Sequence, residues 1–182
     1  MSDGVDGILR QWVRERPDLD VSPMAIVGRI SRIGRKIDPL LSSVFRKFGL
    51  EQWSFDVLAT LRRSGPPYEL TPTQLFSSLM LTSGAITHRA DGLVKAGLVQ
   101  RTPDPSDRRG VRVKLTALGL AKINEAVTAH VENERRIVRH LSKQERSLLI
   151  SLLRRFLWSL EKPGEEPVPP KGRKRVGKPR RR

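Results

Sequence analysis

Hydrophobic residues recur every three or four positions along most of the chain, which is the period of an amphipathic helix. Short polar or proline- and glycine-rich stretches separate the periodic segments, as expected at helix ends. The pattern predicts helices over residues 5–16, 22–48, 51–63, 71–80, 83–96, 116–140 and 142–160. Pro39 lies inside the second of these segments and is expected to kink it.

The period changes from about 3.6 to 2 between residues 99 and 115. Val99, Val111 and Val113 alternate there with polar neighbours, which predicts a two-stranded hairpin. The polar, turn-rich residues 103–110 are expected to form its loop.

A short helix pair followed by a hairpin is the order of a winged helix-turn-helix, in which the second short helix enters the major groove of DNA. The predicted fold is therefore mainly α with a small β-hairpin wing. The long helices before and after these elements are too apolar for so small a domain to bury alone, which predicts a helical dimerisation region. We expect an N-terminal extension (1–21), a winged-helix domain (22–161) and a basic tail (162–182). Within the domain, 22–48 and 116–161 would supply the dimerisation helices, and 50–115 the DNA-binding lobe.

The charge of the chain points to a polyanionic partner. There are 35 Lys and Arg residues against 19 Asp and Glu, a formal net charge of +16, and double-stranded DNA is the natural partner of such a protein. Residues 162–182 hold nine Lys and Arg, two Glu and almost nothing apolar. We expect this tail to be disordered by itself.

Several functions are disfavoured by what the sequence lacks. It has no cysteine and only three histidines, so we expect no disulfide, metal site or cofactor. No phosphate-binding glycine loop or metalloprotease motif occurs, and we expect no enzyme activity. No signal peptide or apolar run of about 18 residues is present, so a protein of the cytoplasm and its nucleoid is expected, with no membrane partner.

The predicted second short helix carries the first set of candidate DNA contacts. Its inner face would include Leu93 and Val94. The start of its outer face is small and polar, which allows close approach to base edges and hydrogen bonding. The candidate contacts on this helix are Ser83, Gly84, Thr87, His88 and Arg89. A merely solvated helix face is the alternative interpretation.

The predicted wing carries the second set, Asp107, Arg108 and Arg109. Arginines at a wing tip suit the minor groove, where a narrow A·T segment concentrates negative potential. Asp107 is expected to hold one of these guanidiniums by a charge-assisted bond. A solvated turn is the alternative, but helix and wing together favour DNA.

The segment TSGAITHRADGLVKAGLVQRTPDPSDRRGVRVKLTALG, which begins at Thr82, resembles the recognition helix and wing of the MarR family. The aspartate-any-arginine wing signature of that family falls on Asp107 and Arg109, and its leucine-threonine pair on Leu115 and Thr116. The resemblance extends over about residues 24–160. It implies a homodimeric regulator, expected to be a repressor, that binds pseudo-palindromic operators and is relieved by a small aromatic or phenolic effector.

The N-terminal segment with Trp12, followed by RPDLDVSPMAIVGRI, looks like the subset of the family that includes urate-responsive regulators. This resemblance implies a ligand contact for Trp12; the alternative is that Trp12 packs an added helix onto the dimer scaffold.

Two further functional hypotheses stay open. One is an architectural, nucleoid-type protein that binds DNA through charge and its tail, and the other is a partner protein bound by the apolar helices.

Overall fold

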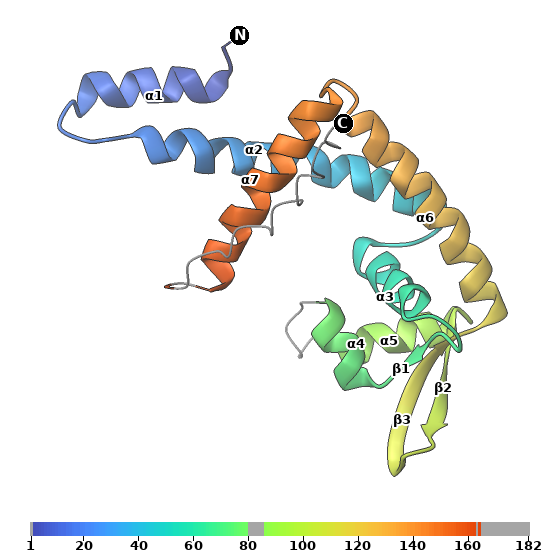
Figure 1. Cartoon of the computed structure of the whole chain (residues 1–182). Coiled ribbons are helices and arrows are strands. Elements are labelled where there is room, and N and C mark those ends of the chain that lie inside the picture. The colour runs from blue at the N-terminus through green and yellow to red at the C-terminus, as the bar shows by residue number, and fades with distance from the viewer. Residues whose placement is uncertain (1, 80–85, 163, 165–182) are drawn as a thin grey trace, which may run out of the picture. The chain divides into compact units, whose positions relative to one another are not determined.

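The structure is a computed structural model that describes residues 2–79, 86–162 and 164. The chain forms two compact units, Met1–Ile137 and Val138–Arg182. The elements of the first unit, in chain order (Figure 1), are α1 (Gly4–Glu15), α2 (Ser22–Lys47), α3 (Gln52–Arg63), β1 (Glu69–Leu70), α4 (Pro72–Leu79), α5 (Ile86–Lys95), β2 (Val99–Asp104), β3 (Asp107–Leu115) and α6 (Ala117–Ile137). The second unit contains α7 (Lys143–Glu161).

The three strands form one antiparallel sheet in the order β1-β3-β2. Val99 faces Leu115 at the base of the hairpin, and Asp104 faces Asp107 at its far end. In Figure 1 the hairpin extends away from the helices as a long ribbon. Together with α4 and α5 this arrangement confirms the predicted winged helix-turn-helix.

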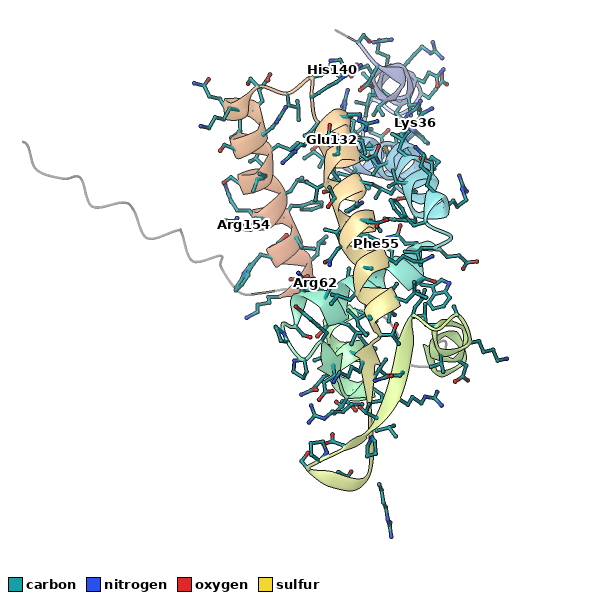
Figure 2. The ribbon with its side chains drawn as sticks, turned by 90° about the vertical axis from the view of Figure 1, so that its right-hand side faces the viewer. Lys36, Phe55, Arg62, Glu132, His140 and Arg154 are labelled. Carbon is teal, nitrogen blue, oxygen red and sulfur yellow. The ribbon has the colours of Figure 1, made fainter. Side chains whose placement is uncertain are left out.

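The core lies where α2 ends and α3, α4, α5, the sheet and α6 meet. Phe45 and Phe55 stack with their ring centroids 4.1 Å apart, and the His130 ring from α6 lies 4.8 Å from Phe55. Arg62, labelled with Phe55 in Figure 2, donates a hydrogen bond of 2.7 Å to Asn124 on α6. The side of α3 next to α6 therefore carries both apolar and polar contacts.

The start of α6 is fixed to the end of the helix-turn-helix by Thr116. Its hydroxyl donates to the carbonyl of Gly97 at 2.7 Å and accepts the Gly119 N–H at 3.0 Å, which satisfies a donor at the helix N-terminus. Gly119 lies so close to the Leu98 carbonyl that a Cβ would overlap it. The hairpin and α6 thus meet through backbone contacts that only glycine allows.

Two sequence predictions need correction. Pro39 lies inside α2 as expected, and the kink there stays a prediction. The helix α6 ends at Ile137, before the expected boundary near residue 140. The loop predicted at 103–110 is wrong, because β3 begins at Asp107 and only two residues connect the strands. The short strand β1 was not predicted, since two residues give no measurable alternation.

The second unit confirms the capping box predicted for the last helix. The Ser142 hydroxyl accepts the N–H of Glu145 at 3.2 Å, and the Glu145 carboxylate accepts the N–H of Ser142 at 2.7 Å. These bonds hold the pKa of Glu145 below its ordinary value. Within the part of the chain that the structure describes, no helix is long and apolar enough to cross a membrane.

Candidate nucleic-acid interface

The recognition helix predicted at 83–96 corresponds to α5. Ser83 and Gly84 lie outside the described residues, and so does the expected cap at Thr82 or Ser83. Thr87, His88 and Arg89 lie on the helical backbone of α5, although the structure does not describe their side chains. The structure thus places three of the five candidate residues on one helix of the helix-turn-helix.

Leu93 anchors the inner face of α5 in the core with 3% of its surface exposed. Val94 was predicted to share that face, but it is 37% exposed, because one helical position turns its side chain by about 100° away from Leu93. Gly97, with φ of +67°, ends the helix in the left-handed conformation that glycine favours. The chain then reverses directly into β2.

An ion pair joins the outer side of α5 to the first strand of the wing. The Arg101 guanidinium donates to the Asp91 carboxylate at 2.6 Å. Both side chains are nearly half exposed, so the pair contributes modestly to stability. It nevertheless restricts how the wing can turn relative to the recognition helix, and it neutralises one wing arginine.

Asp107 organises the backbone of the wing turn. Its carboxylate accepts the backbone N–H of Arg109 at 2.9 Å, which is an Asx-type turn. The described bond therefore organises the backbone of the turn, and the bond from Asp107 to a guanidinium stays a prediction. The Arg109 side chain is exposed, while that of Arg108 lies outside the described residues.

A buried carboxylate stabilises the same turn. Asp104 is only 8% exposed and accepts from the hydroxyl and the N–H of Ser106 at 2.7 and 2.9 Å. Arg112 donates to it at 3.2 Å. The Ser106 bonds, assisted by Arg112, hold the pKa of Asp104 below its ordinary value, so this carboxylate stays ionised at neutral pH.

Charges at the base of the wing are paired across the sheet. Glu69 on β1 lies 3.9 Å from the Arg112 guanidinium and 3.7 Å from the Lys114 ammonium. The base of the wing is thus largely neutralised, and the exposed Arg109 carries positive charge at the tip.

Gly110 lies so near the wing turn that a Cβ at this position would be 2.9 Å from the Asp104 Cβ.

Sequence reasoning missed the residues that position this interface: Glu69, Asp91, Arg101, Asp104 and Arg112. Strand alternation alone could have placed Arg112 and Lys114 on one face of β3. Their acidic partners come from β1 and from the other strand, and the sequence gives no local signal for that pairing.

Trp12, the candidate ligand contact, lies on α1 and is 41% exposed. It is therefore on a different element from the DNA-contact candidates. No group of three or more His, Cys, Asp or Glu side chains able to hold a metal ion occurs among the residues described.

Comparisons with known proteins agree with this architecture. Residues 50–111 match the model of the MarR family. The chain is 46% identical over 151 residues to the HTH-type transcriptional regulator PecS of Dickeya dadantii, covering 83% of this chain and 91% of that protein. It is 33% identical over 135 residues to the multiple antibiotic resistance protein MarR of Escherichia coli, covering 72% and 90%.

Solved structures give the same assignment. A mutant of E. coli MarR in complex with operator DNA superposes with a TM-score of 0.65 at 30% identity, covering 75% of this chain and 95% of that one. AbsC of Streptomyces coelicolor, a MarR family regulator, superposes with a TM-score of 0.70 at 22% identity, covering 79% and 97%. The latter likeness concerns the fold alone.

The fold and the wing define a DNA-binding winged-helix protein, and this chain belongs to the MarR family. Its relatives are transcriptional regulators and not enzymes. The predicted family, fold class and absence of enzyme activity are therefore confirmed.

Proposed function

We propose that this protein is a sequence-specific transcriptional regulator, most simply a repressor, that binds pseudo-palindromic operators as a homodimer. A small aromatic or phenolic effector would release it from DNA. The observation that carries the proposal is the division of charge on the wing. Carboxylates pair Arg101, Arg112 and Lys114 along the strands of the wing, and Arg109 stays exposed near its tip.

The division of charge favours specific binding because it limits nonspecific attraction to a small area. Thr87, His88 and Arg89 of α5, together with the preceding Ser83 and Gly84, would contact the major groove. Arg108 and Arg109 would enter the neighbouring minor groove, where an A·T segment favours a guanidinium. A structurally similar MarR mutant was solved in complex with operator DNA, which supports DNA as the partner.

Exposed apolar side chains support the homodimer. Large hydrophobic residues of α2 and α7 are exposed by 37–64%, far above the residues of the core. They are Ile26, Ile30, Ile33 and Leu40 on α2, and Leu148, Leu149, Ile150, Leu152, Leu153, Phe156, Leu157 and Leu160 on α7. A twofold interface would remove them from water and present two recognition helices about one DNA turn apart.

An effector needs only a modest coupling free energy, on the order of 1–3 kcal/mol, to alter operator occupancy. Trp12 is the candidate effector contact on this chain, since its indole is partly exposed.

The proposal places the protein in the cytoplasm, on the nucleoid. It also assigns residues 1–21, 22–161 and 162–182 to an added helix, the regulator domain and a basic arm.

The net charge of +16 supports one other function, that of an architectural DNA-binding protein that acts through charge. The substitution Arg109→Ala distinguishes the two. As a control, Arg135→Ala removes an arginine that is 73% exposed on α6, away from the wing, so both variants lose one charge.

With a duplex containing an A·T-flanked operator at about 150 mM salt, we expect Arg109→Ala to weaken binding about tenfold or more. Arg135→Ala should change it little. Equal effects of the two substitutions, measured by fluorescence anisotropy, would assign binding to net charge and contradict the proposed role of the wing.

A further inference from the structure

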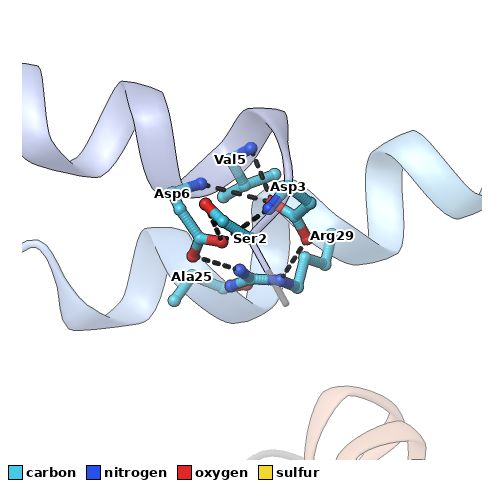
Figure 3. A network of polar contacts seen from close by, with 6 residues as sticks. All are labelled: Ser2, Asp3, Val5, Asp6, Ala25 and Arg29. Carbon is cyan, nitrogen blue, oxygen red and sulfur yellow. Dashed lines mark hydrogen bonds and ion pairs between the residues drawn. The ribbon is translucent and has the colours of Figure 1, made fainter.

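The first helix is held against the second by a compact ionic network. The Arg29 guanidinium on α2 pairs with both Asp3 and Asp6, which also cap the start of α1 (Figure 3). Val5, 4% exposed, packs beside Gly28, where an added Cβ would be 3.4 Å from its side chain. Polar and apolar contacts thus fix the two helices in register.

A groove of about 280 Å³ lies between these two helices. Its apolar part is formed by Val5, Ile8 and Leu9 of α1 and by Met24 and Val27 of α2. Ser31, Arg32 and Arg35 follow on the same face of α2, because positions 24, 27, 28, 31, 32 and 35 repeat at helical spacing. The groove therefore has an apolar portion and a cationic portion.

The two guanidiniums of the groove differ from Arg29 in their partners. Arg29 is neutralised by two carboxylates. Among the described residues, neither Arg32 nor Arg35 forms an ion pair or a hydrogen bond to a side chain. Arg32 lies against the backbone of Gly4, where a Cβ would come within 3.1 Å of its terminal nitrogen. Glycine at this position leaves room for the guanidinium at the start of α1.

We propose that the groove between α1 and α2 binds a small amphipathic monoanion, a carboxylate carried on a short apolar body. Arg32 and Arg35 offer planar donor pairs that match a carboxylate, while Ile8, Leu9, Met24 and Val27 contact the apolar part. The volume is near the lower end of small-molecule sites, roughly 300–1,000 Å³, so the ligand is small. This site lies on other elements than the wing and α5, and its occupancy can be measured without DNA.

Isothermal titration of the full-length protein with sodium hexanoate tests the proposal, with hexanamide as the uncharged probe of the same length. Hexanoate should bind, and hexanamide at least tenfold more weakly. The double variant Arg32→Gln/Arg35→Gln should lose hexanoate binding by tenfold or more. A control variant, Arg10→Gln/Arg14→Gln, removes two arginines of α1 that do not line the groove and should bind as the wild type does.

Equal affinities for hexanoate and hexanamide would overturn the proposal, as would unchanged binding by the Arg32/Arg35 variant whose helix content and melting match the wild type. A second copy of the chain is the competing occupant of the groove. If hexanoate does not bind and the Arg32/Arg35 variant dissociates more readily in sedimentation, the groove is a protein interface and the proposal is wrong.

Discussion

The DNA-binding lobe and the helix pair α1–α2 use similar apolar residues in opposite ways. In the lobe, Leu58, Leu61 and Leu75 are at most 1% exposed, and Phe45 at the end of α2 joins the same core. Along the rest of α2, Ile26, Val27 and Ile33 are more than half exposed. Hydrophobic periodicity therefore identifies which face of a helix is apolar, but not whether the same chain covers it.

Glycine gives the sharpest test of this contrast. Gly119→Ala should cost about 4 kcal/mol or more of unfolding free energy, because the new Cβ would overlap the Leu98 carbonyl and the backbone must move. Gly34→Ala on α2 meets nothing within 4 Å and should stabilise the helix by roughly 0.5–1 kcal/mol. Chemical denaturation measures both. A Gly119→Ala protein as stable as the wild type would contradict the close contact between the hairpin and α6.

Leucine truncations compare the lobe with α7. Leu58→Ala removes a side chain with no exposure and should cost ~2–5 kcal/mol of unfolding free energy. Leu153→Ala removes one that is 46% exposed, so at a protein concentration that keeps the dimer intact its effect on melting should be much smaller. Sedimentation should instead show dimer dissociation about tenfold easier. If Leu153→Ala left the dissociation constant unchanged, α7 would not be part of the proposed dimer interface.

The basic tail tests whether specificity resides in the lobe. Truncation after Glu161 removes nine Lys and Arg residues and should make the salt dependence of DNA binding less steep, by about 0.9 in log–log slope per lost phosphate contact. Preference for operator over scrambled DNA should persist. Loss of that preference on truncation would assign sequence recognition to the tail.

The smallest effect on stability is expected from changes to the ionic network of Arg29, Asp3 and Asp6, which fixes α1 against α2. The pKa values of Asp3 and Asp6 are held below the ordinary 3.8, chiefly by backbone N–H donors and then by Arg29. Because the folded state favours the ionised carboxylates, their stabilisation is present above the ordinary pKa and is lost as the pH falls through the lowered values.

Hydrogen exchange in α1, corrected for intrinsic rates, should therefore show little change between about pH 7 and pH 5 and faster opening below about pH 3.8. Arg29→Gln should speed opening at neutral pH by about a few-fold, because solvent-exposed ion pairs contribute little to stability. Arg14→Gln is the control, since Arg14 pairs with its exposed neighbour Glu15 and with no other residue that the structure describes. Identical exchange in both variants would show that apolar contacts alone hold α1.

The sequence predicted the helices, the hairpin and their order because each depends on local periodicity and capping. The capping box at Ser142 and Glu145 is the clearest example, since both partners lie within one turn. The sequence could not predict the strand β1 or the ion pairs of Glu69, Asp91 and Asp104, because their partners come together only in the folded protein. For Asp107 the sequence predicted the place in the wing turn but not the bond to the backbone N–H of Arg109, because short polar side chains at tight turns also bond to nearby backbone groups.

Binding to a duplex from the region upstream of the protein's own gene, compared with a scrambled duplex of equal length across a salt series, tests the central claim most directly. We predict a specificity ratio of roughly 10³ or more at physiological salt, with two protected half-sites about one helical turn apart. The contrary result is a specificity ratio near one at every salt concentration, both for this upstream duplex and for DNA fragments selected from the genome by binding. That result would contradict a sequence-specific regulator and identify a protein that binds DNA through charge.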